Sequence, residues 1–217
     1  MLSAPISADP APALVPMGAA HFPLAAPGPT RKIAFLLVPG FTLLAFSSAI
    51  EPLRIANQLA QAPLYHWQVL SEEGAPVTSS GGITVQVHAP LAPLPRDTDL
   101  LLCAGNPAAS ALRPEIVSPL QRHARFGGRV GGICTGAFAL AAGGLLRERR
   151  FTLHWENQPA FSETFPDLIP RETLFELEGN VMTCGGGAAA TDMMIARISA
   201  AHGRDFAAMV SDMCLRK

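Results

Sequence analysis

Residues 131–141 read GGICTGAFALA, and this stretch decides the fold. A short apolar run at 130–133 leads directly into Cys134, and an Ala-rich segment with helical character follows to about residue 142. A strand that turns sharply at a Cys-x-Gly sequence into a helix is the geometry of a nucleophile elbow. The stretch therefore predicts a buried strand, a tight turn and a helix, with the Cys134 thiol at the turn.

Apolar strands and helical segments alternate on both sides of this elbow. Short apolar or alternating runs that end at turn residues favour strands at 32–38, 65–70, 83–87, 99–103, 130–133, 151–153, 173–177 and 181–184. Helical spacing favours helices at 43–60, 115–125, 137–142, within 154–165, and from 185–187 to about 201. This alternation predicts an α/β fold with a mostly parallel sheet covered by helices on both faces.

The charge balance and composition exclude several classes of protein. The 217 residues include 16 Lys and Arg and 17 Asp and Glu, for a net charge of −1, whereas a nucleic-acid-binding domain needs an excess of basic residues. With 49% hydrophobic and 15% charged residues, the chain can bury a full core and is not a disordered protein. The sequence contains no apolar run of about 18 residues and no basic-then-apolar leader. We therefore expect a soluble, cytoplasmic protein.

The first 30 residues differ from the rest. They are rich in Ala and Pro, and proline fixes φ and removes a hydrogen-bond donor. We predict a flexible or extended tail at 1–30 and one domain at 31–217. The four cysteines of the chain contain no C-x-x-C pair, which predicts free thiols and no metal site; no cofactor is expected either.

Cys134 admits two interpretations. A thiol at a helix N-terminus gains from the helix dipole and from backbone N–H groups, which lower its pKa. Alternatively, Cys134 is a buried small residue in a tight turn. His154, at the end of another expected strand, is either a proton shuttle or orienting donor for the thiol, or an ordinary hydrogen-bonded histidine.

Two further features suggest binding. Glu51 interrupts an apolar helical stretch, where an acid needs a partner such as Arg54, Asn57 or a ligand, unless it lies on a solvated face. Cys184 is followed by three glycines at the start of a helix. Such a segment either offers backbone N–H groups to an anion or only permits a tight turn.

Several motifs in order resemble one superfamily. KIAFLLVPGF, GGICTGAFALAAGGLL, RRFTLHWE and VMTCGGGAAATDMMI are similar to the ThiJ/PfpI superfamily, whose fold is a flavodoxin-like three-layer α/β/α sandwich of the class I glutamine-amidotransferase type. More closely, they resemble the N-terminal ligand-sensing domain of GlxA-like AraC-family transcription regulators. The segment EPLRIAN is similar to branches that sense carnitine, glycine betaine or arginine.

The resemblance also implies an alternative as an enzyme, because the elbow cysteine of the superfamily's enzymes is the reactive thiol. Thr135 stands where protease-type members carry His, which disfavours a protease. Cys-Thr-Gly with a later His154-Trp155 resembles isocyanide hydratases, but the carboxylate of those enzymes aligns with Ala45, and Glu51 falls six residues later. Without that acid a hydration mechanism lacks its proton-transfer group, so the departure favours sensing over catalysis.

The expected function is therefore a sensor domain. It would form a homodimer and bind a small amine or amino-acid-like metabolite at the carboxyl ends of the strands. DNA would be contacted only through a C-terminal helix-turn-helix domain beyond these residues, because the residues after Gly203 carry a net charge of only +1. Oxidation of Cys134 in a redox sensor is a third alternative. The expected ligand-binding residues are Phe41, Glu51, Gly105, Asn106, Cys134, Thr135, His154, Trp155, Cys184, Gly185 and Gly186.

Overall fold

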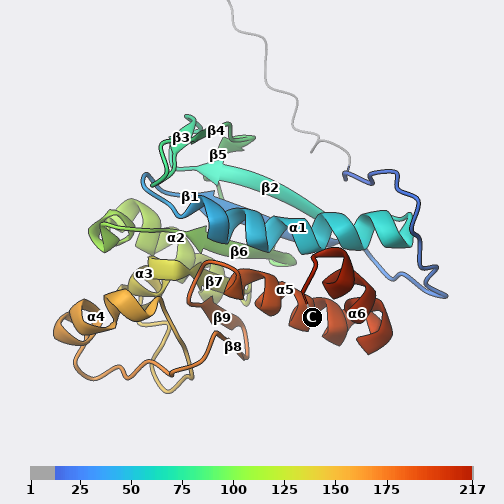
Figure 1. The fold of residues 1–217 in the computed structure, drawn as a ribbon. Helices are drawn as coiled ribbons and strands as arrows, with labels where there is room; N and C mark the ends of the chain where they lie inside the picture. The colour runs from blue at the N-terminus through green and yellow to red at the C-terminus, as the bar shows by residue number, and fades with distance from the viewer. Residues whose placement is uncertain (1–12, 217) are drawn as a thin grey trace, which may run out of the picture.

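A computed structural model describes residues 13–216 and contains a seven-stranded central sheet (Figure 1). The strand order is β5-β2-β1-β6-β7-β9-β8, and only the β8–β9 pair is antiparallel. The strands are β1 Arg31–Leu37, β2 Tyr65–Ser71, β5 Ala89–Pro90, β6 Thr98–Cys103, β7 Val130–Ile133, β8 Phe175–Glu178 and β9 Val181–Cys184. The predicted mostly parallel sheet is confirmed.

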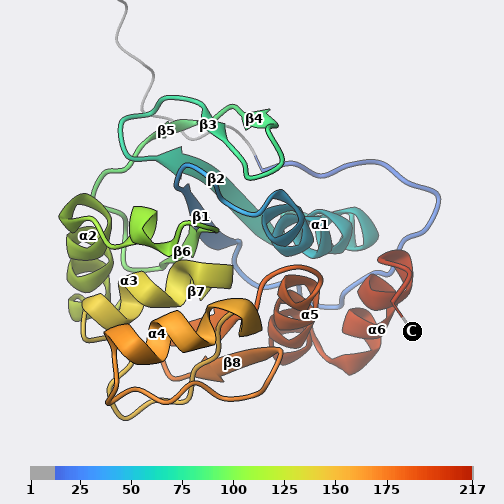
Figure 2. The ribbon, with the colours of Figure 1, turned by 60° about the vertical axis from the view of Figure 1, so that its left-hand side comes forward.

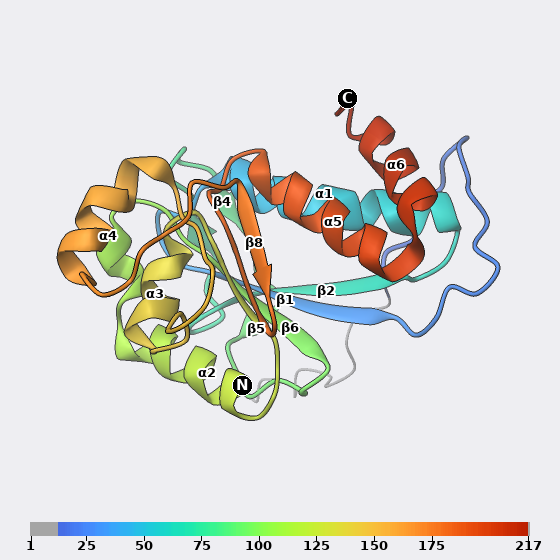
Figure 3. The same cartoon turned by 90° about the horizontal axis from the view of Figure 1, so that it is seen from below.

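Helices cover both faces of the sheet, as Figures 2 and 3 show. One face carries α1 Leu43–Ala60, α5 Ala189–His202 and α6 Arg204–Met213. The other carries α2 Pro114–Arg125, α3 Ala137–Ala142 and α4 Gln158–Thr164. Short 3-10 turns are η1 Ala108–Ala111, η2 Cys134–Gly136 and η3 Trp155–Asn157. The expected three-layer α/β/α sandwich is confirmed.

The continuous apolar run of β1 explains why this strand lies in the interior of the sheet, between β2 and β6. Ile33, Phe35 and Leu37 point into the core beneath α1 and α5, whereas Ala34 and Leu36 point into the core beneath α2 and α3. Side chains of a strand alternate between its faces, so a strand covered on both sides must be apolar throughout.

Two expected strands are wrong in extent or pairing. The strand expected at 83–87 is only β4 Thr84–Val85, which pairs antiparallel with β3 Val77–Thr78 in a separate two-stranded sheet. The segment 151–153 is not a strand: the Thr152 N–H donates to the Thr183 hydroxyl at 2.9 Å instead of to a ladder carbonyl. Its apolar side chains still enter the core, which explains the strand-like pattern.

Two segments near the chain ends add to the α1 side. The helix α6 was not expected from the sequence, although Phe206 and Val210 are buried one turn apart on it. Residues 13–30 form no helix or strand, but the Phe22 N–H donates to the Leu59 carbonyl and its ring lies edge-on to Phe206. Residues 1–12 of the predicted tail lie outside the described residues. Within 13–216, no helix has the length and apolarity that a bilayer crossing requires.

Candidate functional site

Three neighbouring strands end level with one another at the edge that holds Cys134. Cys103 of β6, Ile133 of β7 and Cys184 of β9 are successive partners across the sheet. Cys134 follows Ile133 directly, so the three thiols gather at the carboxyl ends of the strands. This is the edge at which open α/β folds bind ligands.

The backbone at Cys134 has the geometry of a nucleophile elbow. Its φ is 60°, in the left-handed region that residues other than glycine rarely adopt. Glycines make the tight turn possible: a Cβ at Gly132 would lie 2.6 Å from the Gly136 carbonyl carbon, and one at Gly136 would lie 2.7 Å from the Leu102 carbonyl oxygen. The strand, turn and helix predicted from GGICTGAFALA are confirmed.

The thiol is nevertheless held in its protonated form. Cys134 is only 6% exposed, and burial raises the pKa of its thiol. Hydrogen bonds from the Thr42 hydroxyl and the Thr135 backbone lower the pKa by less than burial raises it, and the negative charge of Glu156 raises it further. The donors at the helix start lower the pKa as expected, but desolvation of the thiolate outweighs them, so the net shift is upward.

Four loops converge around the thiol. The Thr42 hydroxyl, from the loop after β1, donates to Cys134 Sγ at 3.5 Å. The Thr135 hydroxyl donates to the Gly105 carbonyl at 2.8 Å and so ties the elbow to the loop after β6. A Cβ on Gly186, after β9, would lie 2.8 Å from Cys134 Cβ. The structure thus brings Gly105, Cys134, Thr135 and Gly186 together, as the sequence predicted, and adds Thr42, which it did not.

The backbone N–H groups of Gly185 and Gly186, in the glycine run after β9, donate hydrogen bonds to acceptors within the protein. The Gly185 N–H donates to the Leu174 carbonyl at 2.9 Å. The backbone of Gly186 and of Cys134 hydrogen-bonds the Cys184 thiol, yet burial dominates and raises the pKa of Cys184 to about 12. The N–H groups expected to bind an anion at Gly185 and Gly186 are therefore engaged within the protein, and the tight-turn interpretation describes them better.

A second group of polar side chains lies on the loop that follows residue 153. His154 Nδ1 lies 3.8 Å from a Glu156 carboxylate oxygen, and its ring stacks on Trp155 with 5.6 Å between centroids. Trp155 is 76% exposed, and Asn157 Nδ2 donates to Asn106 Oδ1 at 2.7 Å. In the described chain no hydrogen bond joins His154 to Cys134. Glu156 adjoins the His154-Trp155 pair and belongs to the candidate site, although no sequence motif indicated it.

Phe41 and Glu51 lie away from the expected binding surface. Phe41 is completely buried, with its ring edge-on to Phe46. Glu51 pairs with Arg54 at 2.7 Å on α1, and its charge acts on Cys214 at the end of α6. The structure therefore gives this acid an arginine partner one helical turn away, and the ligand contacts expected at Phe41 and Glu51 stay predictions.

Ala45, the position aligned with the carboxylate of isocyanide hydratases, is buried in the core. Within residues 13–216, no cluster of three or more His, Cys, Asp or Glu side chains is placed to hold a metal ion.

Comparison with known proteins identifies the family. The sequence model of the DJ-1/PfpI family matches residues 31–200. The chain belongs to the DJ-1/PfpI family. The superfamily resemblance drawn from the elbow, the first strand and the late cysteine-glycine motif is thus confirmed.

Curated relatives of this DJ-1/PfpI domain include transcription regulators. The chain is 46% identical to the HTH-type transcriptional regulator GlxA of Rhizobium meliloti over 186 residues, which are 85% of this chain and 57% of that protein. It is 44% identical to the HTH-type transcriptional regulator CdhR of Pseudomonas aeruginosa over 178 residues, 82% of this chain and 53% of that protein. The chain therefore spans about half the length of these relatives.

Solved structures agree on the DJ-1/PfpI fold. The crystal structure of an AraC family transcriptional regulator from Pseudomonas putida superposes with a TM-score of 0.76, at 24% identity, and the match covers 84% of this chain and 98% of that one. An enzyme of the family is a more distant relative: the isonitrile hydratase of Pseudomonas putida is 27% identical over 82% of this chain and 75% of that protein.

Proposed function

We propose that this DJ-1/PfpI domain is the ligand-sensing part of a transcription regulator and not an enzyme. The observation that carries the proposal is the 44–46% identity to two HTH-type regulators over more than four fifths of the chain. In such a regulator the helix-turn-helix segment contacts DNA, which suits a sensor domain with a net charge of −1. The domain itself contributes ligand binding and self-association.

The chemistry around Cys134 supports sensing over catalysis. The nucleophile of a thiol enzyme is the thiolate, which an adjacent base or a lowered pKa provides. Here the side-chain partner of Sγ is the Thr42 hydroxyl, and burial raises the thiol pKa. A hydroxyl is not a base at neutral pH, so the thiol keeps its proton.

The ligand that fits best is a small metabolite with a cationic amine group. The exposed face of Trp155 receives a cation through its π system, and the exposed carboxylate of Glu156 adds a charge contact. Asn106 and Asn157 border the same surface through their mutual hydrogen bond. This set replaces Phe41 and Glu51, whose side chains are occupied elsewhere.

Calorimetry with glycine betaine, carnitine, choline and arginine tests the ligand class. We expect at least one of them to bind, and Trp155→Ala to weaken binding about tenfold, as the loss of a cation–π contact of about 1–2 kcal/mol implies. Phe126→Ala is the matched control, since Phe126 is another exposed aromatic and follows α2. Failure of all four compounds to bind, or equal losses in both variants, would remove this ligand assignment.

Self-association is a separate part of the proposal. We expect a homodimer of 22.8 kDa subunits, because symmetric dimers are the commonest assembly of soluble proteins and operator half-sites match a two-fold axis. Sedimentation equilibrium would give a mass near twice that of the subunit. A single subunit mass over the micromolar range contradicts the dimer without affecting the ligand proposal.

A cysteine-dependent hydratase is the alternative, favoured by the strained elbow at Cys134 and by the isonitrile hydratase relative. Purified domain would then turn over an isocyanide, and Cys134→Ser would abolish the reaction. Turnover well above background that depends on this thiol overturns the choice of sensor over enzyme. Equal, slow conversion by wild type and variant agrees with it.

A further inference from the structure

A second polar cluster lies at the opposite edge of the sheet, where the strands begin. Arg31 and Tyr65 are the first residues of β1 and β2 and are partners in the parallel register. Asp99 is the second residue of β6, and Arg129 immediately precedes β7. Because side chains alternate along a strand, Arg31 lies on the face of Ile33 and Phe35, which is the face beneath α5.

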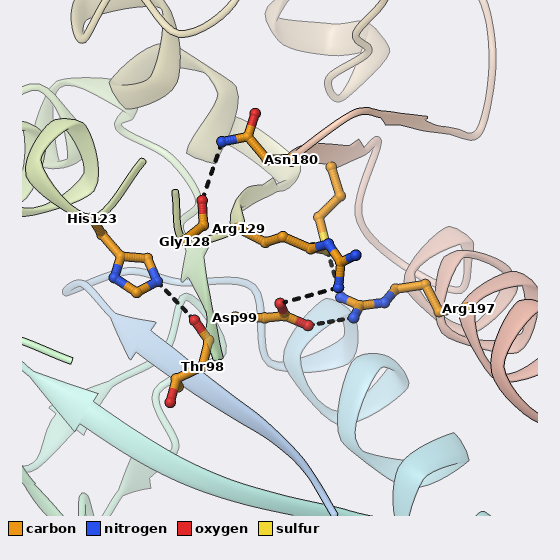
Figure 4. Close-up of polar contacts among 8 residues, drawn as sticks. Thr98, Asp99, His123, Gly128, Arg129, Asn180 and Arg197 are labelled. Atoms are coloured by element: carbon orange, nitrogen blue, oxygen red, sulfur yellow. Dashed lines mark hydrogen bonds and ion pairs between the residues drawn. The ribbon is translucent and has the colours of Figure 1, made fainter. Parts of the chain in front are cut away.

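Arg197 completes this cluster from α5. Its guanidinium forms a short ion pair with Asp99 Oδ2, and Arg129 Nη1 lies 3.9 Å from Asp99 Oδ1, so the carboxylate pairs with two arginines (Figure 4). Arg197 Nη1 also donates to Met182 Sδ at 2.9 Å. These contacts fix the direction in which the Arg197 side chain extends across the strand starts.

The cluster lines a cavity of about 320 Å³ with an excess of positive charge. Its lining residues are Arg31, Tyr65, Arg129, Leu177, Gly179, Val181, Met182, Arg197, Ala200 and Ala201. Arg31, Arg129 and Arg197 line the cavity, and the Asp99 carboxylate pairs with the last two, which leaves a local charge of +2 in a chain whose net charge is −1. Arg31 forms no ion pair within residues 13–216. The cavity therefore holds more positive charge than the protein itself compensates.

Tyr65 supplies an independent sign of a ligand. The residue is 2% exposed, and its hydroxyl has no hydrogen-bond partner among the residues the structure describes. The charges of Arg31, Arg197 and Asp99 act on the pKa of this hydroxyl. The His202 ring lies edge-on to the phenol, with 5.6 Å between the ring centroids. A buried polar group that makes no hydrogen bond is costly, so native proteins rarely keep one without a partner.

The side chains of Arg31, Arg129, Arg197 and Tyr65 together favour an anionic ligand. Arginine guanidinium groups bind carboxylate and phosphate oxygens through paired N–H donors. Burial raises the pKa of Tyr65 to about 12, so its hydroxyl remains a donor at neutral pH. His202 has a lowered pKa, also from burial, and stays neutral there. The polar side chains of the cluster that are not paired with Asp99, those of Arg31, Tyr65 and His202, are therefore cationic or neutral.

We propose that this cavity binds a small molecule with a phosphate or carboxylate group, which Arg31, Arg129, Arg197 and the Tyr65 hydroxyl hold together. The site lies at the opposite end of the strands from Cys134 and does not depend on the ligand proposed there. It would let a second, anionic metabolite act on the same domain. The site borders α5, and α5 packs on α1 and α6, so an anion bound here would contact the helix that joins this face of the domain.

Calorimetry with inorganic phosphate and with citrate, at low ionic strength, tests the site. We expect one of them to bind with a dissociation constant in the millimolar range or tighter, and the tighter of the two identifies the group that is recognised. Tyr65→Phe removes only the hydroxyl and is expected to weaken binding about tenfold or more, the effect of a lost hydrogen bond to a charged group. Circular dichroism should show an unchanged fold.

Arg129→Gln provides a second variant, because Arg129 is half exposed and its contact with Asp99 is long. It should weaken binding of the same anion, whereas Arg147→Gln, a matched loss of one exposed charge outside the cavity, should not. Equal affinity of wild type, Tyr65→Phe and Arg129→Gln, or no binding of either anion at millimolar concentration, would overturn the proposal.

Discussion

The Thr42 hydroxyl donates a hydrogen bond of 3.5 Å to the Cys134 thiol and joins the loop after β1 to the elbow after β7. A donor at this position stabilises negative charge on sulfur, yet it offers no site that accepts the thiol proton at neutral pH. Because burial outweighs the donor, the elbow presents a strained backbone and an unactivated thiol. Cys134 therefore has the backbone geometry of a nucleophile elbow but not the activated thiolate of a catalytic cysteine.

Alkylation kinetics should reveal the protonated state of Cys134. Its pKa is raised above the ordinary value of 9.0, and the thiolate is the reacting species, so modification by iodoacetamide at pH 7 should be slow and should accelerate above pH 9. Mass spectrometry of peptides resolves each cysteine, with the partly exposed Cys214 as the internal reference. Modification of Cys134 ahead of Cys214 at pH 7 contradicts the raised pKa.

Thr42→Val removes the hydrogen bond while keeping the shape of the side chain. Loss of this donor destabilises the thiolate, so the pKa should rise further and alkylation of Cys134 at pH 9 should slow about threefold to tenfold. Thr164→Val, in the exposed face of α4, is the matched control and should leave the rate unchanged. An identical pH profile in both variants would mean that the hydroxyl does not act on the sulfur.

Features set by neighbouring residues were predictable from the sequence. The elbow at Cys134 and the helix α1 follow from local spacing, and α1 has the predicted bounds of 43 and 60. Strand pairing is different, because it depends on partners far along the chain: the apolar run at 151–153 enters the core without joining a ladder. The helix α6 also has a local pattern, with Phe206 and Val210 buried one turn apart.

The direction of side chains at the site could not be predicted. The strand-end rule places the backbone of Phe41 near the binding edge, but only the packed structure shows its ring turned into the core against Phe46. For Glu51, the partner Arg54 is three residues away, a spacing that favours an ion pair on one helix face. No sequence motif indicates the cavity lined by Arg31, Tyr65 and Arg197, because its residues come from the starts of separate strands and from α5.

Gly186 should tolerate a side chain poorly. A Cβ there would lie 2.8 Å from Cys134 Cβ, and its φ of 85° is unfavourable for other residues, so Gly186→Ala should lower the free energy of unfolding by about 2–4 kcal/mol. Gly187 has a φ of 54° and open space around its missing Cβ, so Gly187→Ala should cost only about 1 kcal/mol. Urea unfolding compares the two, and equal losses would mean that contact with Cys134 contributes nothing.

Tyr65 is the single tyrosine of the chain, so its ionisation can be followed by tyrosinate absorbance without interference from another phenol. Burial raises its pKa from 10.0 to about 12 in the folded protein. The titration midpoint should therefore lie near pH 12 for the folded chain and near pH 10 in denaturant. A folded-state midpoint near pH 10 would show that the phenol is solvated.

The same shift fixes how stability depends on pH. Between pH 10 and 12 the unfolded chain releases the phenol proton while the folded chain retains it, so unfolding becomes more favourable as pH rises. The contribution of Tyr65 is fully present below pH 10, and roughly 3 kcal/mol is lost by pH 12, from two units at 1.36 kcal/mol each. Tyr65→Phe cannot ionise, so its free energy of unfolding should fall less over this range. Parallel stability curves for the two proteins would contradict the buried, protonated phenol on which the anion site depends.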